Sequence, residues 1–374
     1  MKERNKHIVF VNHTREQHGS EQVMLETLRQ CRTQGWRVTV VLPCNQPDGG
    51  LAKAIGKEAN ILYLNYKNVG ESLLRTIAIE FYNLLAVIRL SRWIRKNRVD
   101  VIYSNTSVTL LGIEAARWTK TPHVWHWHEL PSKEFGWSKS VLQILQYWKK
   151  YTSKLLFISD TQKQLWENAL GKSHIDNAQV IYNPIRTIHA IPKKDPKCVR
   201  IGYIGSFMER KNLSWLIQIV AQLADEYDLH LSLYGAKDPQ EKESIQMQYK
   251  NIPALTVHEF TDDIESVYSN LDIFVLPSWS ETMPLVVLEA MQAGVCVIQT
   301  ANSGMVEIMH DGEECLFIRP EEKESLIEAL IRCLDPVYRA RIAQQGQRFA
   351  TQWIAKNNYQ RRIIAVFKSL IKEA

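Results

Sequence analysis

Short apolar runs rich in β-branched and aromatic residues alternate with helix-like stretches along almost the whole chain. The expected strands of the first half are 7–12, 37–42, 61–64, 100–105, 123–128, 154–159 and 179–183, and the expected helices include 21–34, 72–97 and 138–151. Such alternation is typical of parallel sheets built from βαβ units. It therefore predicts a doubly wound α/β fold.

A proline-rich segment interrupts this alternation. Residues 183–197 contain three prolines and several charges, which is typical of a linker. A second series of expected strands follows at 199–206, 229–235, 255–260, 272–278, 295–300 and 315–320, and the chain is helical from about 322 onward. We therefore predict two Rossmann-like domains, 1–186 and 199–355, a linker at 187–198, and a helix at 356–374 that packs back on the N-terminal domain. In such sheets ligands bind beyond the carboxyl ends of the strands, so we expect the site in the cleft between the domains.

The composition is that of an ordinary globular enzyme, with 45% hydrophobic and 23% charged residues. The apolar run Ile8–Val11 is too short for a signal peptide, and no stretch is long and apolar enough to span a bilayer. None of the six cysteines forms a CxxC pair, which favours reduced thiols. These features predict a cytoplasmic protein.

Positive charge is concentrated in the first half of the chain. Residues 1–187 hold 26 Lys and Arg against 15 Asp and Glu, although the whole chain carries only +6. Chance scatter is one explanation; attraction to a phosphorylated acceptor or an anionic membrane surface is another. Trp93, Trp137 and Trp148 lie near basic residues and would suit peripheral membrane binding, unless they are helix core. We see no motif for nucleic acid.

The segment from Glu281 to Glu289 carries the strongest chemical signal. A strand ends at Pro277, and a loop leads into a helix that is apolar on nearly every face and therefore buried. Glu289 lies inside this helix, where a lone carboxylate is costly and needs a partner in the protein or in a ligand. Glu281 lies beside the helix N-terminus, a place that favours a phosphate. The alternative is that Glu281 caps the helix, as Ser280 or Thr282 also could, and that Glu289 pairs with an arginine.

Two glutamates eight residues apart in PSWSETMPLVVLEAMQAG resemble the signature of the glycosyltransferase group 1 family, also called family four. The resemblance covers nearly the whole chain and implies the two-domain GT-B fold, with an acceptor-binding N-terminal domain and a nucleotide-sugar-binding C-terminal domain. It implies that Glu281 contacts the donor sugar and that Glu289 binds the ribose. It further implies that backbone amides contact the sugar and diphosphate, at Thr282, Met283, Pro284 and Leu285.

Two further elements are similar to phosphate contacts of that family. Gly205 ends a strand, and Arg210 and Lys211 precede a helix, which resembles a glycine–arginine…lysine element that clamps the diphosphate. Ser206 departs from the pattern, since arginine is common there; Arg210 is a candidate to compensate, and both cations could instead be solvated. Gly19 opens another helix, where His18 replaces a glycine of the family; an ordinary helix start capped by Ser20 is equally consistent.

Histidines and glycines at other strand ends complete the expected site. His126 and His128 lie on one face of a strand, so they could bind zinc, fill the core, or line the cleft as a histidine of the family does. We favour His128 in the cleft, because it is nearer the end of the strand. Gly235 is a weaker expected donor contact.

The chain contains no DxD motif, so we expect metal-independent transfer with no cofactor, in which Lys211 and helix N-termini stabilise the leaving diphosphate. The resemblance implies a retaining transfer from a nucleotide-sugar, UDP by default, to a glycan or lipid-linked acceptor in polysaccharide or glycoconjugate synthesis. The catalytic candidates are His128, Lys211 and Glu281. The alternatives are an epimerase-like enzyme, a sugar-nucleotide-binding protein without turnover, and a metal-dependent hydrolase built on His126 and His128.

Overall fold

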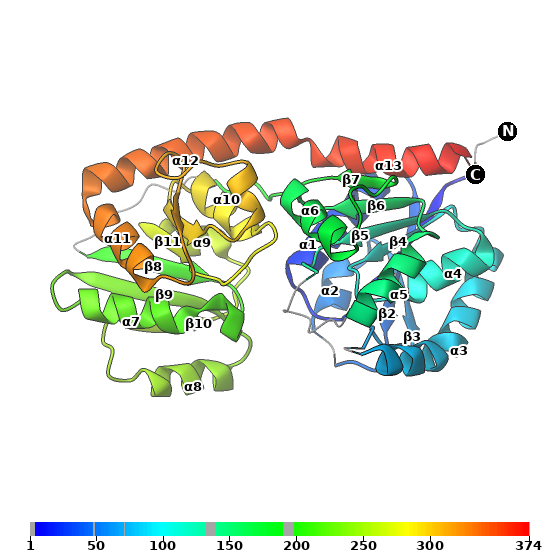
Figure 1. Cartoon of the computed structure of the whole chain (residues 1–374), viewed down its shortest axis with the longest axis horizontal. Helices are drawn as coiled ribbons and strands as arrows, with labels where there is room; N and C mark the ends of the chain where they lie inside the picture. Colours follow the sequence, from blue (N-terminus) through cyan, green and yellow to red (C-terminus); the bar gives the residue numbers. More distant parts are fainter. Residues whose placement is uncertain (1–3, 48, 71, 132–138, 190–197, 374) are drawn as a thin grey trace. The chain divides into compact units, whose positions relative to one another are not determined.

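The computed structural model describes residues 4–47, 49–70, 72–131, 139–189 and 198–373. The chain divides into two units, Met1–Pro184 with Asn358–Ala374 and Ile185–Asn357. They are called the N-terminal and C-terminal domains below (Figure 1). Most of the predicted linker 187–198 lies outside the described residues.

The N-terminal domain is built on a parallel sheet with helices on both faces (Figure 1). Within the described residues the sheet has seven strands in the order β3-β2-β1-β4-β5-β6-β7. The strands are β1 (His7–Val11), β2 (Arg37–Pro43), β3 (Asn60–Leu64), β4 (Val101–Asn105), β5 (His123–Trp127), β6 (Lys154–Phe157) and β7 (Ala178–Val180). The helices are α1 (Gly19–Thr33), α2 (Leu51–Ile55), α3 (Leu73–Asn97), α4 (Leu111–Thr119), α5 (Lys139–Lys149) and α6 (Asp160–Ala169).

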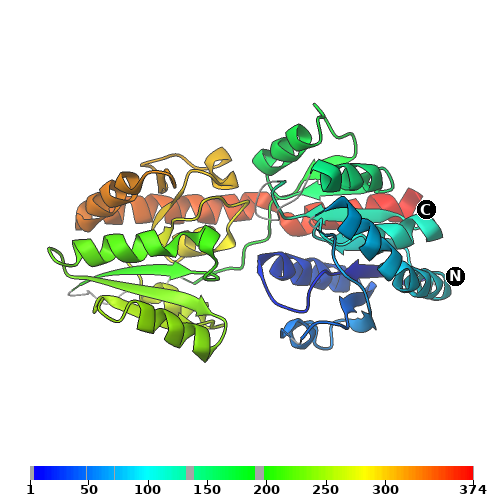
Figure 2. The same cartoon turned by 60° about the horizontal axis from the view of Figure 1, so that its bottom comes forward.

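The C-terminal domain repeats this architecture around a second parallel sheet (Figure 2). Its six strands in the described part of the chain follow the order β10-β9-β8-β11-β12-β13. They are β8 (Val199–Ile204), β9 (Leu229–Ala236), β10 (Leu255–Glu259), β11 (Ile273–Leu276), β12 (Cys296–Thr300) and β13 (Leu316–Ile318). The helices are α7 (Leu213–Leu223), α8 (Pro239–Gln248), α9 (Ile264–Ser269), α10 (Leu285–Gln292), α11 (Lys323–Leu334) and α12 (Pro336–Asn357), with 3₁₀ turns η2 (Glu209–Lys211) and η3 (Gly304–Glu307).

The central strands are buried along their whole length, as expected for strands covered by helices on both sides. In each sheet the strand order reverses once, between β1 and β4 and between β8 and β11. Such reversals open a crevice at the carboxyl ends of the strands, where ligands bind in doubly wound folds. The predicted class of two doubly wound domains is confirmed, and the crevices locate the residues discussed below.

The last helix, α13 (Tyr359–Glu373), belongs to the N-terminal domain (Figures 1 and 2). Asn358 adopts φ +44° between α12 and α13, a left-handed conformation that ends α12. The Tyr359 hydroxyl lies 2.5 Å from Thr27 Oγ1 on α1, and Phe367 packs against the rings of Phe10 and Tyr103. These contacts bury one face of α13 against the N-terminal core.

Candidate functional site

A partly buried ion pair lies at the carboxyl end of the C-terminal sheet. Lys211 Nζ is 2.5 Å from Glu281 Oε1, and Arg210 Nη1 is 3.9 Å from Glu281 Oε2. Burial raises the pKa of the Glu281 carboxyl, but the charges of Lys211 and Arg210 and the hydrogen bond from Lys211 outweigh it, so this pKa lies below its usual range. Glu281 is therefore an anion that holds a lysine ammonium in a fixed place.

Backbone hydrogen bonds join the loops that carry this pair. Trp279 N–H donates to Arg210 O at 2.9 Å, which ties the loop after β11 to η2. Glu281 N–H donates to Asn302 O at 2.8 Å, and Glu281 forms an isolated parallel bridge with Ser303. Loops that follow β8, β11 and β12 thus meet at one point.

The start of α10 differs from the expected one. Its N-cap is Pro284, without a side-chain cap, so capping by Ser280, Glu281 or Thr282 is wrong. The reason is the strand-like bridge to Ser303, which keeps the backbone extended at Glu281 and directs its carboxylate to Lys211. Pro284 has no N–H, so the predicted row of backbone donors reduces to Thr282, Met283 and Leu285.

Gly205 and Gly235 have a packing reason to be glycine. Both have positive φ, +149° and +136°, and a Cβ on Gly235 would lie 2.1 Å from Gly205 O. Gly205 N–H donates to Tyr234 O at 2.9 Å, so the ends of β8 and β9 approach closely. Ser206 O accepts from the Tyr203 hydroxyl at 2.8 Å at the same turn. The predicted contacts of Gly205, Ser206 and Gly235 with the donor stay predictions, because close backbone packing already explains both glycines.

Glu289 pairs with an arginine, which is one of the two alternatives that the sequence left open for this carboxylate. Arg186 donates from Nε to Oε1 at 2.7 Å and from Nη2 to Oε2 at 3.1 Å, and the Tyr268 hydroxyl donates to Oε2 at 3.1 Å. The Glu289 side chain is only 4% exposed, whereas that of Arg186 is 51% exposed. The predicted ribose contact is untouched by this result, since a carboxylate can accept about four hydrogen bonds.

A cavity of about 430 Å³ opens beside the turns that carry Ser206 and Gly235. Phe207, which follows Ser206, and Lys237, which follows Gly235 by two residues, line it together with residues of α8. It is open to solvent and lined mainly by polar and charged side chains.

In the N-terminal domain a buried polar network surrounds His128 at the ends of β1, β4 and β5. Asn105 Oδ1 lies 3.1 Å from His128 Nε2, and Asn105 Nδ2 donates to Asn12 Oδ1 at 2.9 Å. The same amide is 3.4 Å from Glu21 Oε1, and Glu21 also lies 3.5 Å from His13 Nδ1. Asn12, Glu21 and Asn105 are fully buried.

This network sets the tautomer of His128. Because the Asn105 amide nitrogen already donates to other acceptors, its oxygen must accept a hydrogen bond, and His128 Nε2 therefore carries the hydrogen that is donated to it. The lone pair of the ring then lies on Nδ1. Burial, with the nearby rings of His126 and His13, lowers the pKa of His128 well below its usual value, so the imidazole is neutral at pH 7.

Gly19 allows a direct test of ligand approach. It is the first residue of α1, its φ is not positive, and a Cβ there would meet no atom within 4 Å. Gly19→Ala should therefore leave the stability unchanged or raise it by about 0.5–1 kcal/mol. If a ligand approaches the backbone here, the variant raises KM at least about tenfold, measured by steady-state kinetics beside a thermal melt. An unchanged KM would leave Gly19 as an ordinary helix start.

His18, not Ser20, is the N-cap of α1, so the expected Ser20 cap is wrong. The Ser20 hydroxyl instead donates to Glu21 Oε2 at 3.0 Å, and His18 N–H donates to the same oxygen at 3.2 Å. The Glu21 carboxylate therefore accepts both of these hydrogen bonds at the start of α1.

The buried histidines of β5 also predict how stability responds to acid. Burial lowers the pKa of His123 to about 3, and hydrogen bonds join its ring to Thr152 and Ser104. The unfolded chain takes up a proton near pH 6.5, whereas the folded chain does so only near pH 3, so stability is lost as pH falls between these values. His123→Gln should reduce that slope most near pH 5, where the unfolded imidazole is almost fully protonated, by up to about 1.4 kcal/mol per pH unit. Urea unfolding from pH 7 to 5 checks this, with exposed His174→Gln as control; equal slopes would contradict it.

Sequence reasoning missed Glu21, Asn105 and Arg186. An acidic residue in the first turn of a helix looks like an ordinary dipole contact, and an asparagine at the end of a strand looks like the start of a turn. Their partners are distant in sequence: 84 residues separate Glu21 from Asn105, and 103 separate Arg186 from Glu289. The apolar sequence around Glu289 predicted a partner, without identifying it.

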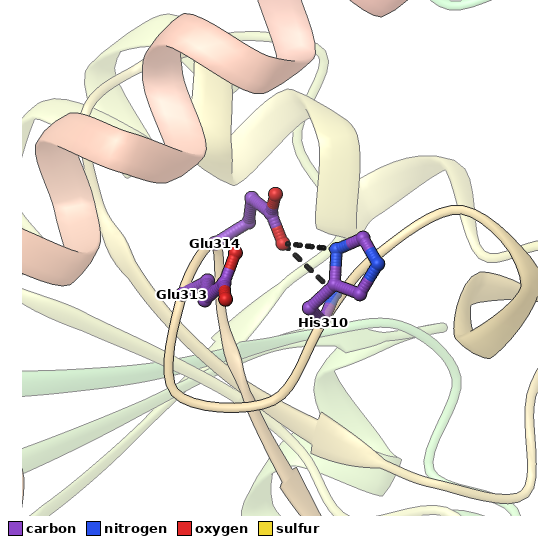
Figure 3. A group of neighbouring side chains, drawn as sticks. All are labelled: His310, Glu313 and Glu314. Carbon is purple, nitrogen blue, oxygen red and sulfur yellow. Dashed lines mark hydrogen bonds and ion pairs between the residues drawn. The ribbon is translucent and has the colours of Figure 1, made fainter.

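The zinc alternative at His126 and His128 lacks a third ligand in the described residues. His126 Nδ1 lies 2.6 Å from the Tyr103 hydroxyl, and Glu129 Oε2 accepts from the Ser107 hydroxyl and the backbone N–H groups of Ser107 and His128. In the described part of the chain, the group of metal-binding residue types that comes together is His310, Glu313 and Glu314 (Figure 3). Two of these are exposed, and His310 Nδ1 pairs with Glu314 at 3.5 Å, so the group is a surface ion pair with an acidic neighbour.

Family comparisons agree with the two-domain division. Residues 18–188 match the model described as Glycosyltransferase Family 4, and residues 198–336 match the model described as Glycosyl transferases group 1. The chain belongs to this glycosyltransferase family. The first match covers most of the N-terminal domain and ends four residues inside the C-terminal one, and the second lies within the C-terminal domain. Gly19 and His128 fall in the first match, and Lys211, Glu281 and Glu289 fall in the second.

Individual relatives of this family member are distant. Over 131 residues it is 30% identical to the sulfoquinovosyl transferase of Arabidopsis thaliana, a match that covers 35% of this chain but only 24% of that protein. It is 24% identical over 289 residues to an Escherichia coli UDP-Gal:alpha-D-GlcNAc-diphosphoundecaprenol alpha-1,3-galactosyltransferase, covering 71% and 73% of the two chains. Among solved structures, Anabaena HepE in complex with UDP and glucose superposes with a TM-score of 0.79 and 19% identity, over 98% and 100% of the chains. This likeness establishes the GT-B fold.

Proposed function

We propose that the protein transfers a sugar from a nucleotide diphosphate donor to a hydroxyl of a glycan or lipid-linked acceptor, in polysaccharide or glycoconjugate synthesis. The observation that carries this proposal is the partly buried Lys211–Glu281 pair beside the start of α10, in a chain of this family. The pair brings a fixed cation and an anion to the carboxyl end of a doubly wound sheet, where such folds bind nucleotides.

Lys211 and Glu281 have complementary roles in this proposal. The leaving diphosphate gains negative charge as the glycosidic bond breaks, and the Lys211 ammonium stabilises it without a metal ion. Glu281 holds that ammonium and accepts hydrogen bonds from hydroxyls of the donor sugar. Arg210 reaches the same carboxylate and supplies a second cation near the turn where Ser206 replaces arginine.

His128 is the proposed contact to the reacting sugar from the N-terminal domain. Its ring is neutral and held by Asn105, so it offers an uncharged hydrogen-bonding edge. We propose retention of anomeric configuration by front-side attack, in keeping with the family resemblance.

UDP is the proposed nucleotide and a lipid-linked glycan the proposed acceptor class. The Anabaena structure contains UDP, and the name of the Escherichia coli relative gives both a UDP-sugar and a diphosphoundecaprenol-linked acceptor. The basic N-terminal domain suits such an acceptor at an anionic membrane surface. No helix among the described residues meets the length and hydropathy needed to cross a membrane.

The test is incubation with a panel of UDP-, GDP- and ADP-sugars, with and without a polyprenyl-diphosphate-linked acceptor and in the presence of EDTA. We expect acceptor-dependent release of UDP that EDTA does not abolish, and a product with the donor's anomeric configuration by NMR. Isomerised donor without release would indicate an epimerase-like enzyme. Tight donor binding without turnover would indicate a binding protein, and loss of activity in EDTA would overturn metal independence.

A further inference from the structure

Helix α3 carries an unusual amount of exposed apolar surface for a helix of a globular domain. Phe81 is 76% exposed, Leu74 81% and Leu85 56%, and several neighbours on the helix are also exposed. Those neighbours are Leu73, Ile77, Tyr82 and Leu84. Contiguous exposed apolar residues of this kind mark an interaction surface.

The exposed residues form one continuous line along the helix, in which positions recur every three or four residues. We call this line the α3 stripe; its members are Leu74, Ala78, Phe81, Leu85, Arg89, Arg92 and Lys96, all exposed. Residues with this spacing lie on one face of an α-helix. The stripe is apolar in its first half and cationic in its second. The helix α3 itself lies beside α4 and α5 (Figure 1).

Helix α3 itself carries almost no acidic side chains that could oppose this charge. Glu80 is the sole acidic residue between Leu73 and Asn97, and its Oε1 accepts a hydrogen bond from the Trp148 indole at 2.9 Å. Arg75 and Arg95 on the same helix are exposed as well. The α3 surface is therefore apolar and cationic, which fits an anionic partner that has an apolar layer behind its charges.

The cationic end of the stripe continues into a basic cavity. Lys96 lines a cavity of about 350 Å³ together with Arg4, Asn5, Arg37, Asn97 and Arg98. Asp100 neutralises Arg4 at 2.5 Å, which leaves a net positive set of lining residues. A cavity with this charge and volume suits a phosphate headgroup.

Trp93 and Trp148, which the sequence suggested for membrane contact, do not belong to this exposed surface. Trp148 is 8% exposed and belongs to a core cluster, and Trp93 packs against the core beneath α3. The expected alternative, that they are helix core, therefore holds for both, and Trp137 lies outside the described residues. The apolar surface that is available for membrane contact is instead formed by the exposed residues of α3.

We infer that α3 docks the protein on an anionic phospholipid bilayer, with Leu74, Phe81 and Leu85 entering the acyl boundary and Arg89, Arg92 and Lys96 contacting headgroup phosphates. The helix lies along the membrane surface and does not cross it, because cations occupy the second half of its exposed face. This inference deepens the proposed function and rests on it for the lipid-linked acceptor. It requires no step of the transfer reaction.

Vesicle flotation tests the inference with the full chain. We expect binding to phosphatidylcholine vesicles that contain phosphatidylglycerol and little binding to pure phosphatidylcholine. The triple variant Leu74→Ser, Phe81→Ser, Leu85→Ser should lower the partition coefficient at least about tenfold, since these side chains supply the apolar area. Arg89→Gln with Arg92→Gln should also weaken binding and reduce its salt dependence. Met247→Ser and Val337→Ser, which alter apolar residues of the C-terminal domain that are 68% and 78% exposed, are matched controls and should bind normally.

Several outcomes would overturn the inference. These are failure of the wild type to bind the anionic vesicles at low salt, normal binding by the triple variant, and a wild-type dimer that the triple variant converts to monomer without any vesicle binding. The last outcome, measured by light scattering, would assign the stripe to a second copy of the chain. Glu281→Ala should float like the wild type, and the triple variant should keep transfer to a water-soluble acceptor. Failure of docking and failure of the proposed function are therefore distinguishable.

Discussion

Lys211→Ala should lower kcat for sugar transfer by about two to three orders of magnitude, the usual effect of removing one group that stabilises a developing anion. The loss has two sources. The leaving diphosphate loses its fixed cation, and Glu281 loses the partner at 2.5 Å, so that Arg210 at 3.9 Å is its nearest remaining charge among the ion pairs described. The pKa of Glu281 should rise as a result, because burial already favours its protonated form. Steady-state kinetics with the donor identified by the panel measures the effect.

The controls separate catalysis from folding. Lys242→Ala removes a lysine from another Lys–Glu pair of the same domain, with Glu259 at 3.8 Å, and should keep full activity. Glu281→Ala should be as damaging as Lys211→Ala, and the double variant should be little worse than either, because the two side chains act as one unit. Thermal melts should show all variants folded. Normal turnover in Lys211→Ala or Glu281→Ala would remove the basis for the proposed site.

The sequence was sufficient for the architecture because the relevant signal is local. Runs such as 7–12 and 272–278 are apolar enough to be strands buried on both faces, and the observed strands β1 and β11 fall inside them. Helix starts were less predictable. At α10 the bridge between Glu281 and Ser303 overrides the local capping preference of Ser280 and Thr282.

The candidate site was predictable only where a motif or an unusual local context marks it. Glu281 and Lys211 were identified separately, and the structure adds that they contact each other across 70 residues of sequence. The support of His128 could not be foreseen, since Asn105 is the last residue of β4 and Glu21 lies in α1 after β1, and the two meet only when the sheet order brings β1 beside β4. Tertiary pairing of this kind carries no periodicity or spacing in the sequence.

Arg186→Ala should destabilise the C-terminal domain by about 2–4 kcal/mol, because it leaves a buried carboxylate without its cation. Glu289→Gln should cost less, since the Arg186 side chain is 51% exposed and can be hydrated, whereas that of Glu289 is 4% exposed. The pair Arg186→Ala with Glu289→Gln should be more stable than Arg186→Ala alone. Urea unfolding gives these free energies, and equal costs for the two single variants would contradict the asymmetry.

The same variants decide whether Glu289 also binds the donor ribose. If it does, wild-type protein should bind UDP about tenfold or more tightly than 2′-deoxy-UDP or 3′-deoxy-UDP, because a ribose hydroxyl then donates to the carboxylate. Glu289→Gln should lose most of that discrimination while its affinity for the deoxy nucleotide changes little. If the ion pair with Arg186 is purely structural, Glu289→Gln should weaken the binding of all three nucleotides equally or leave all three unchanged. Calorimetric titration of UDP and the two deoxy nucleotides therefore separates a ribose ligand from a buried ion pair.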